Sequence, residues 1–132
     1  HVLEAVGGYL KLASNLKKNK KLHGEVFNFG PDHTQNYKVL FVVKLMRKYW
    51  SKVSWRIADK NKNSFYESGL LKLNVNKAKI KLQWKSILTL NETINMVTEW
   101  YKSYYLNPKK IYTISLSQIQ KYENLLKKRT II

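Results

Sequence analysis

Apolar residues recur about every 3.6 positions over Val2–Lys18, a spacing that predicts a helix with one apolar face. The positions that carry this pattern are Val2, Leu3, Val6, Leu10, Ala13 and Leu16. A Gly7-Gly8 pair interrupts the pattern, at a cost of roughly 1 kcal/mol each relative to Ala in a helix interior. Glycines tolerated inside a helix usually mark close packing, so we expect another segment to approach the helix tightly at this pair.

The spacing of apolar residues changes after this helix. Glu25–Phe29 consists mostly of β-forming residues and is bounded by Gly30-Pro31, which predicts a short buried strand. Asn36 is a suitable amino-terminal cap for a second helix over Tyr37–Trp50. Val53–Ile57 then alternates apolar and polar residues, the pattern of a half-buried strand.

The middle of the chain has weaker signals. Asp59–Ser64 is polar and is predicted to be a loop, whereas Leu70–Leu73 is predicted to be extended. Asn76 is a candidate cap for a short helix that ends at Leu82.

The capping-box spacing, Ser or Thr followed three residues later by Glu or Gln, occurs at Thr89–Glu92 and at Ser115–Gln118. The first predicts a helix to about Tyr105, ended by Asn107-Pro108, and the second predicts the start of a last helix. The predicted fold class is therefore α/β, helix-rich with a few short strands.

Composition narrows the protein class. The chain has 132 residues, 44% of them apolar, which is enough to bury a core. It has no cysteine, which excludes a disulfide scaffold and a thiolate metal site. No apolar run approaches the roughly 20 residues that a membrane-spanning helix needs, so we expect no membrane partner.

The net charge of +17 has two explanations. Strongly basic chains often bind nucleic acid by neutralising phosphates. Here Lys greatly outnumbers Arg, the residue suited to bidentate phosphate and base contacts, since only Arg47, Arg56 and Arg129 are present. Abundant Lys, Asn, Ile and Tyr also point to A/T-rich codons, so we favour solvated lysine faces and keep a small basic nucleic-acid or polyanion-binding domain as the alternative.

No catalytic set is visible in the sequence. The three histidines, His1, His23 and His33, have no carboxylate at metal-ligand spacing, so we expect no metal site. No Ser or Thr stands beside a plausible base, and no carboxylate pair is suited to acid–base work. We therefore expect no catalytic residue within these 132 residues.

A few residues have both a structural and a functional interpretation. Phe27–Pro31 is either a strand ending in a turn or a strand-end loop at a ligand crevice. Glu67 is either a surface ion-pair partner or an acceptor for a ribose diol. The neighbouring Tyr66 either packs or stacks on a base, and the aromatic cluster at 100–105 is either core and rim or a base-stacking platform.

Several short sequence motifs together resemble those of the CDP-glucose 4,6-dehydratases, which are NAD-dependent nucleotide-sugar enzymes of the extended short-chain dehydrogenase/reductase family. The matching residues are His1-Val2-Leu3-Glu4, Gly8-Tyr9-Leu10, Phe27–Pro31, Trp50, Tyr66–Ala78, Leu82-Gln83-Trp84, Trp100-Tyr101, Gln118-Ile119 and Tyr122-Glu123. Within them, Tyr66 stands where the family has His, Asn74 where it has Asp, and Gln83 where it has Gly.

The resemblance implies a carboxyl-terminal piece of such an enzyme. Residues 1–50 would be the terminal helix–strand–helix of the NAD-binding Rossmann domain, and residues 51–132 would be the nucleotide-sugar-binding region. Glu67, Tyr66 and His1 would contact the substrate, CDP-glucose.

The same resemblance places other parts outside this chain. NAD would bind the full-length parent, and this piece alone would bind none and be inactive. Its partners would be the missing amino-terminal Rossmann portion and, in a cytoplasmic homo-oligomer, further copies of the parent.

Overall fold

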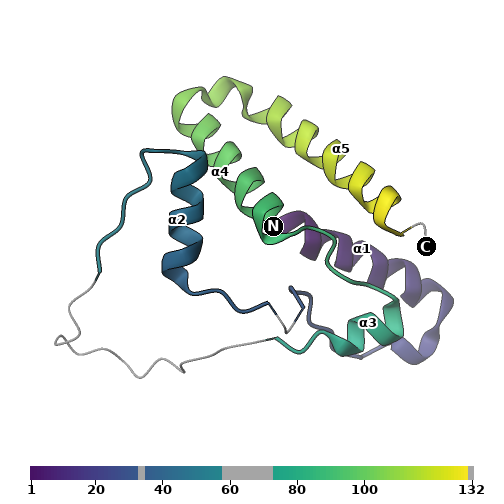
Figure 1. Ribbon diagram of the computed structural model, residues 1–132. Coiled ribbons are helices and arrows are strands. Elements are labelled where there is room, and N and C mark those ends of the chain that lie inside the picture. Colours follow the sequence, from purple (N-terminus) through teal and green to yellow (C-terminus); the bar gives the residue numbers. More distant parts are fainter. Residues whose placement is uncertain (33–34, 58–72, 131–132) are drawn as a thin grey trace.

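The computed structural model describes residues 1–32, 35–57 and 73–130, and within them the chain is helical with irregular connections (Figure 1). The α-helices are α1 (Val2–Lys18), α2 (Val39–Tyr49), α3 (Asn76–Leu82), α4 (Leu90–Leu106) and α5 (Ile111–Thr130). Two 3₁₀ turns, η1 (Lys20–Leu22) and η2 (Pro108–Lys110), follow α1 and α4.

Helices α4 and α5 form an antiparallel hairpin, and α2 lies along α4 (Figure 1). The capping box predicted at the start of α4 is confirmed: Thr89 Oγ1 accepts from Glu92 N at 3.2 Å, and Glu92 Oε2 accepts from Thr89 N at 2.8 Å. The predicted end is also confirmed, with Asn107 as the carboxyl-terminal cap. Pro108 opens η2, where its missing N–H costs no helical hydrogen bond.

Helix α1 has the predicted bounds and packs against the short α3. A first core cluster lies between them, made by Leu22, Val75, Ala78, Leu82 and Trp84 with Leu12, Leu16, Phe27 and Phe29 packed against it. A second cluster forms where α1, α4 and α5 meet, from Ile87, Leu88, Met96 and Tyr122 with Leu3 and Leu125.

Both predicted strands within the described residues are wrong. Residues 25–29 and 53–57 form no strand, and no described segment builds the hydrogen-bonded ladder with them that a strand requires. The alternation after α2 survives as burial only in part, since Val53 and Trp55 are half-buried and Ser54 and Arg56 are exposed, but Ile57 is 84% exposed. The structure therefore supports a helix-rich piece, and the α/β class is not directly seen. The predicted loop at residues 59–64 lies outside the described residues, as does most of the predicted extended run at 70–73.

Three helix starts differ from the prediction. Helix α2 begins at Val39, with Lys38 as its cap and no side-chain cap bond, so Asn36 does not cap it. Asn76 is the first residue of α3 and does not cap it, since Val75 stands at the cap position. The Asn74 side chain accepts from Asn76 N at 2.9 Å instead.

The third helix start that differs from the prediction is that of α5. This helix begins at Ile111, so the predicted capping box at Ser115 and Gln118 is wrong. Ser115 Oγ donates back to the Ile111 carbonyl at 2.8 Å, the bond typical of Ser inside a helix. Gln118 instead points across the hairpin and donates to the Met96 carbonyl on α4 at 2.8 Å. No helix in the described part of the chain is long and apolar enough to cross a membrane.

Candidate functional site

A cavity of about 320 Å³ lies beside Gly30-Pro31. It is bordered by the amino-terminal turn of α1, by residues 29–31 with Gln35 and Tyr37, and by residues 86–93, which include the start of α4. Its polar lining consists of His1, Glu4, Gln35, Tyr37, Ser86 and Thr93. This size is at the lower end for small-molecule pockets.

Of the predicted substrate-binding residues, only His1 can be placed. It borders this cavity together with Gly30-Pro31, and its Nδ1 accepts from Leu3 N at 3.3 Å as the cap of α1. Tyr66 and Glu67 lie outside the described residues. Within the described ranges, no group of three or more His, Asp or Glu side chains is arranged to hold a metal ion.

Among the acidic side chains that the structure describes, the buried one is Glu4, which the sequence reasoning did not single out. Glu4 is only 8% exposed. Its Oε1 accepts from Ile87 N at 2.8 Å and from Leu88 N at 2.6 Å. Its Oε2 accepts from the Tyr122 hydroxyl at 3.0 Å. Burial, together with the Glu4 carboxylate, raises the pKa of Tyr122, so the phenol stays protonated and donates. One carboxylate therefore joins α1, α5 and the segment before α4.

A second polar group holds the same segment from the other side. Arg129 makes a bidentate pair with Glu92, with N–O distances of 2.9 and 2.7 Å, and also donates to the Ile87 carbonyl. Chiefly through these guanidinium bonds, the pKa of Glu92 falls from 4.5 to about 2. Residues 87–92, one border of the cavity, are thus fixed at both ends.

The predicted close approach at Gly7-Gly8 is confirmed, and its reason is visible. A Cβ on Gly8 would lie 2.4 Å from Phe29 Cδ1. The Phe29 ring meets Trp84 edge-on with centroids 5.0 Å apart, and it meets Tyr9 in the same way at 5.5 Å. Only a residue without a side chain at Gly8 lets the Phe29–Pro31 segment come down onto α1 beside the cavity.

Gln83, which stands where the family has Gly, has a strained backbone conformation. Gln83 has φ +52° and ends α3 in the left-handed region that favours glycine. The turn is nevertheless kept, because the Ala78 carbonyl accepts from both Gln83 N and Trp84 N. The side chain at this position therefore does not prevent Trp84 from reaching the core.

The aromatic cluster at residues 100–105 is partly structural. Trp100 donates from Nε1 to Ser115 Oγ at 3.0 Å, which fixes it between α4 and α5. It stacks on Tyr104 with centroids 5.5 Å apart, and Trp50 packs on Tyr105 at 5.9 Å. Tyr104 and Tyr105 remain about half exposed or more, so they form the rim of the α2–α4–α5 packing, as the structural interpretation predicted.

The residues that carry the resemblance thus have mostly structural roles in the described part. Glu4 bonds to Tyr122, Gly8 admits Phe29, and Phe29 packs on Trp84, although these residues are far apart in the sequence. A second group, His1 and Gly30-Pro31, faces the cavity. The sequence motifs that this chain has in common with the family it resembles are therefore expected to reflect a common fold in this region.

Comparison with known proteins agrees with this. None of the protein-family profiles compared matches the chain. Among curated proteins, CDP-glucose 4,6-dehydratase of Salmonella typhimurium (strain LT2) is 32% identical over 105 residues. Those residues make up 79% of this chain but 29% of the Salmonella protein, so the chain spans less than a third of that relative. The comparison confirms that most of this chain resembles a CDP-glucose 4,6-dehydratase.

Proposed function

We propose that this chain is the carboxyl-terminal part of an NAD-dependent CDP-glucose 4,6-dehydratase and supplies one wall of its nucleotide-sugar pocket. The observation that carries the proposal is the 32% identity to the Salmonella dehydratase over four-fifths of the chain. The cavity beside Gly30-Pro31 supports it, because His1 and this loop, both matched to the family, border one space.

The reaction of the proposed parent is that of the dehydratases it resembles. A hydride leaves C4 of the glucose, water is lost across C5 and C6, and the hydride returns to C6, which gives CDP-4-keto-6-deoxyglucose. NAD would accept and return the hydride. The residues of this chain do not fit an NAD site, since its five glycines form no Gly-rich dinucleotide loop. We therefore assign to this chain only substrate contacts, from His1, Tyr66 and Glu67.

An exposed apolar face on α1 supports the missing portion as a partner. Val2, Val6 and Leu10 lie one turn apart on one side of α1, and each is between 41 and 68% exposed. A contiguous apolar stripe on a helix marks a packing surface. We propose that residues 1–50 complete a Rossmann domain through this stripe.

We also propose that residues 51–132 bind the sugar nucleotide and that the parent is a cytoplasmic homo-oligomer.

The test is a titration of the ¹⁵N-labelled chain with CDP-glucose, followed by NMR. We expect saturable shifts of the Gly30 and Gln35 amides, which border the cavity, and no turnover by the chain alone. Absence of these shifts at millimolar ligand would contradict the assignment of the cavity.

A mobility-shift assay addresses the nucleic-acid alternative. We expect only weak binding that is lost at physiological salt and shows no sequence preference. Tight, salt-resistant binding of an oligonucleotide would replace the dehydratase proposal.

A further inference from the structure

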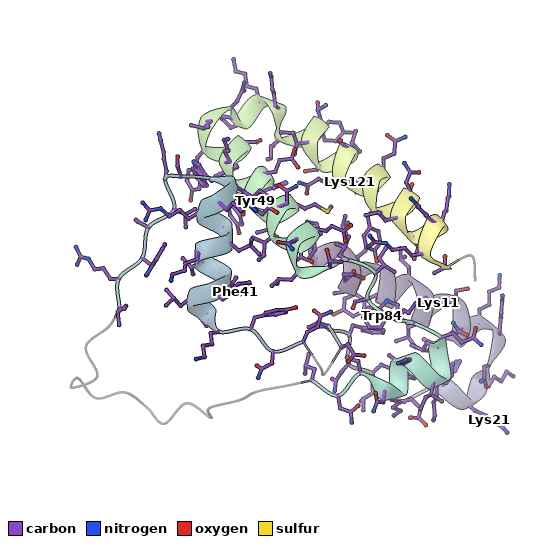
Figure 2. All side chains as sticks on the ribbon, viewed as in Figure 1. Lys11, Lys21, Phe41, Tyr49, Trp84 and Lys121 are labelled. Carbon is purple, nitrogen blue, oxygen red and sulfur yellow. The ribbon has the colours of Figure 1, made fainter. Side chains whose placement is uncertain are left out.

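A second cavity, of about 390 Å³, lies between α1, α5 and the turn after α3. It shares no lining residue with the cavity beside Gly30-Pro31. Three lysines from separate parts of the chain border it: Lys11 on α1, Lys79 on α3, and Lys85 in the segment before α4. Figure 2 labels Lys11 together with Trp84, which also borders the cavity.

No described carboxylate compensates the charge around this cavity. No Asp or Glu is among the described residues that border it. The neighbouring lysines on α3 do form ion pairs, since Lys77 and Lys81 both pair with Glu25. None of Lys11, Lys79 and Lys85 makes an ion pair with a described carboxylate. Three ammonium groups around one concavity repel one another and lower the free energy of a bound anion.

The lining also offers a hydrogen-bond donor and an apolar wall. Trp84 is 7% exposed and borders the cavity, and its indole carries one hydrogen-bond donor, Nε1–H. An anion in the cavity would supply an acceptor for this donor. The Leu126 side chain provides an apolar surface on the same cavity.

From these observations we propose that this cavity, here called the lysine cavity, binds a small phosphorylated anion with two or more negative charges. A phosphoryl group presents three acceptor oxygens, which suits three lysine ammonium groups acting as point charges. Its site is separate from the proposed nucleotide-sugar pocket, so the proposal does not depend on the dehydratase assignment.

The test uses inorganic pyrophosphate as the probe and two matched triple variants of the full 132-residue chain. Lys11→Gln/Lys79→Gln/Lys85→Gln removes the cavity charges. Lys17→Gln/Lys18→Gln/Lys127→Gln removes three exposed lysines that do not border the cavity, so both variants have the same net charge. Pyrophosphate affinity is measured by calorimetry, and the Trp84 indole N–H resonance is followed by NMR.

We expect the cavity variant to bind pyrophosphate at least tenfold more weakly, the control variant to stay within twofold of the parent chain, and the Trp84 resonance to shift on binding. Lys11→Arg/Lys79→Arg/Lys85→Arg, which keeps the charge, should restore at least half of the lost affinity and thereby exclude misfolding as the cause. Equal losses in both Gln variants, or an unmoved Trp84 resonance, would overturn the proposal. So would an oligonucleotide that displaces pyrophosphate and binds far more tightly, because the site would then serve polynucleotides.

Discussion

Replacing the buried Glu4 carboxylate should release the segment before α4 from α1. Glu4→Ala leaves three donors without an acceptor: the Ile87 and Leu88 amides and the Tyr122 hydroxyl. Both amides belong to core residues, 7% and 6% exposed, so water cannot easily replace the lost acceptor.

The magnitude follows from these contacts. Each buried donor left unsatisfied costs about 1–3 kcal/mol. Part of this is offset because a buried charge is removed, so we expect a net loss of about 3–5 kcal/mol, the range for breaking a buried charged group's partnerships. Glu4→Gln keeps the shape and one acceptor oxygen for the two amides, so its loss should be smaller, about 1–2 kcal/mol.

Amide hydrogen exchange measures this directly at the two donors. For Glu4→Ala, a local loss of about 3 kcal/mol corresponds to more than hundredfold faster exchange at Ile87 and Leu88. Glu123→Ala is the matched control, since it removes one exposed carboxylate from α5 and should leave both amides within twofold. If Glu4→Ala also left them within twofold, or if the control had the same effect, the tethering role of Glu4 would be refuted.

Three further substitutions test other contacts. Because its folded pKa of about 2 lies below 4.5, Glu92 stabilises the fold above about pH 4.5 and loses this contribution as the pH falls through 2. Solvent screening of the partly exposed pair limits the effect to about 1–2 kcal/mol. Urea titrations from pH 5 to 2 should show this loss of stability in the wild type and not in Glu92→Gln. Gly8→Ala should lower the unfolding free energy by about 1–3 kcal/mol despite Ala's better helix propensity, and Phe29→Leu in the same chain should recover part of the loss. Thr98 is fully buried and its Oγ1 has no hydrogen-bond partner among the described residues, so Thr98→Val should stabilise by about 1 kcal/mol, with exposed Thr113→Val near zero; a loss at Thr98 would reveal a missed partner.

The sequence predicted well those features that depend on neighbours in the chain. The bounds of α1 follow from its apolar period, and α4 begins at a capping box whose two bonds involve residues three apart. The end of α4 follows from Asn107-Pro108 in the same local way. Each of these signals needs no knowledge of the rest of the fold.

Features that depend on distant partners were missed or misread. Strand propensity at residues 25–29 could not show that no ladder partner is present in the described chain. Ser115 and Gln118 have capping-box spacing, but their side chains bond along α5 and across to α4. Glu4 gave no signal because its partners lie 83 to 118 residues away. Of the three predicted substrate contacts, only His1 falls in the described part, where it borders the cavity.

Reconstitution of turnover tests the dehydratase proposal most directly. The chain would be co-expressed with the part of the Salmonella dehydratase that it does not match, and conversion of CDP-glucose to the 4-keto-6-deoxy product would be measured with NAD present. We expect turnover by the pair and none by either part. In the pair, Glu67→Gln should raise KM by about tenfold to a hundredfold at little cost in kcat. The reason is that a hydrogen bond from the remote ribose to a charged acceptor is worth about 1.5–3 kcal/mol in ground and transition states alike. The account would be contradicted if the pair were inactive while the Salmonella protein's own carboxyl-terminal part, supplied in the same way, restored activity.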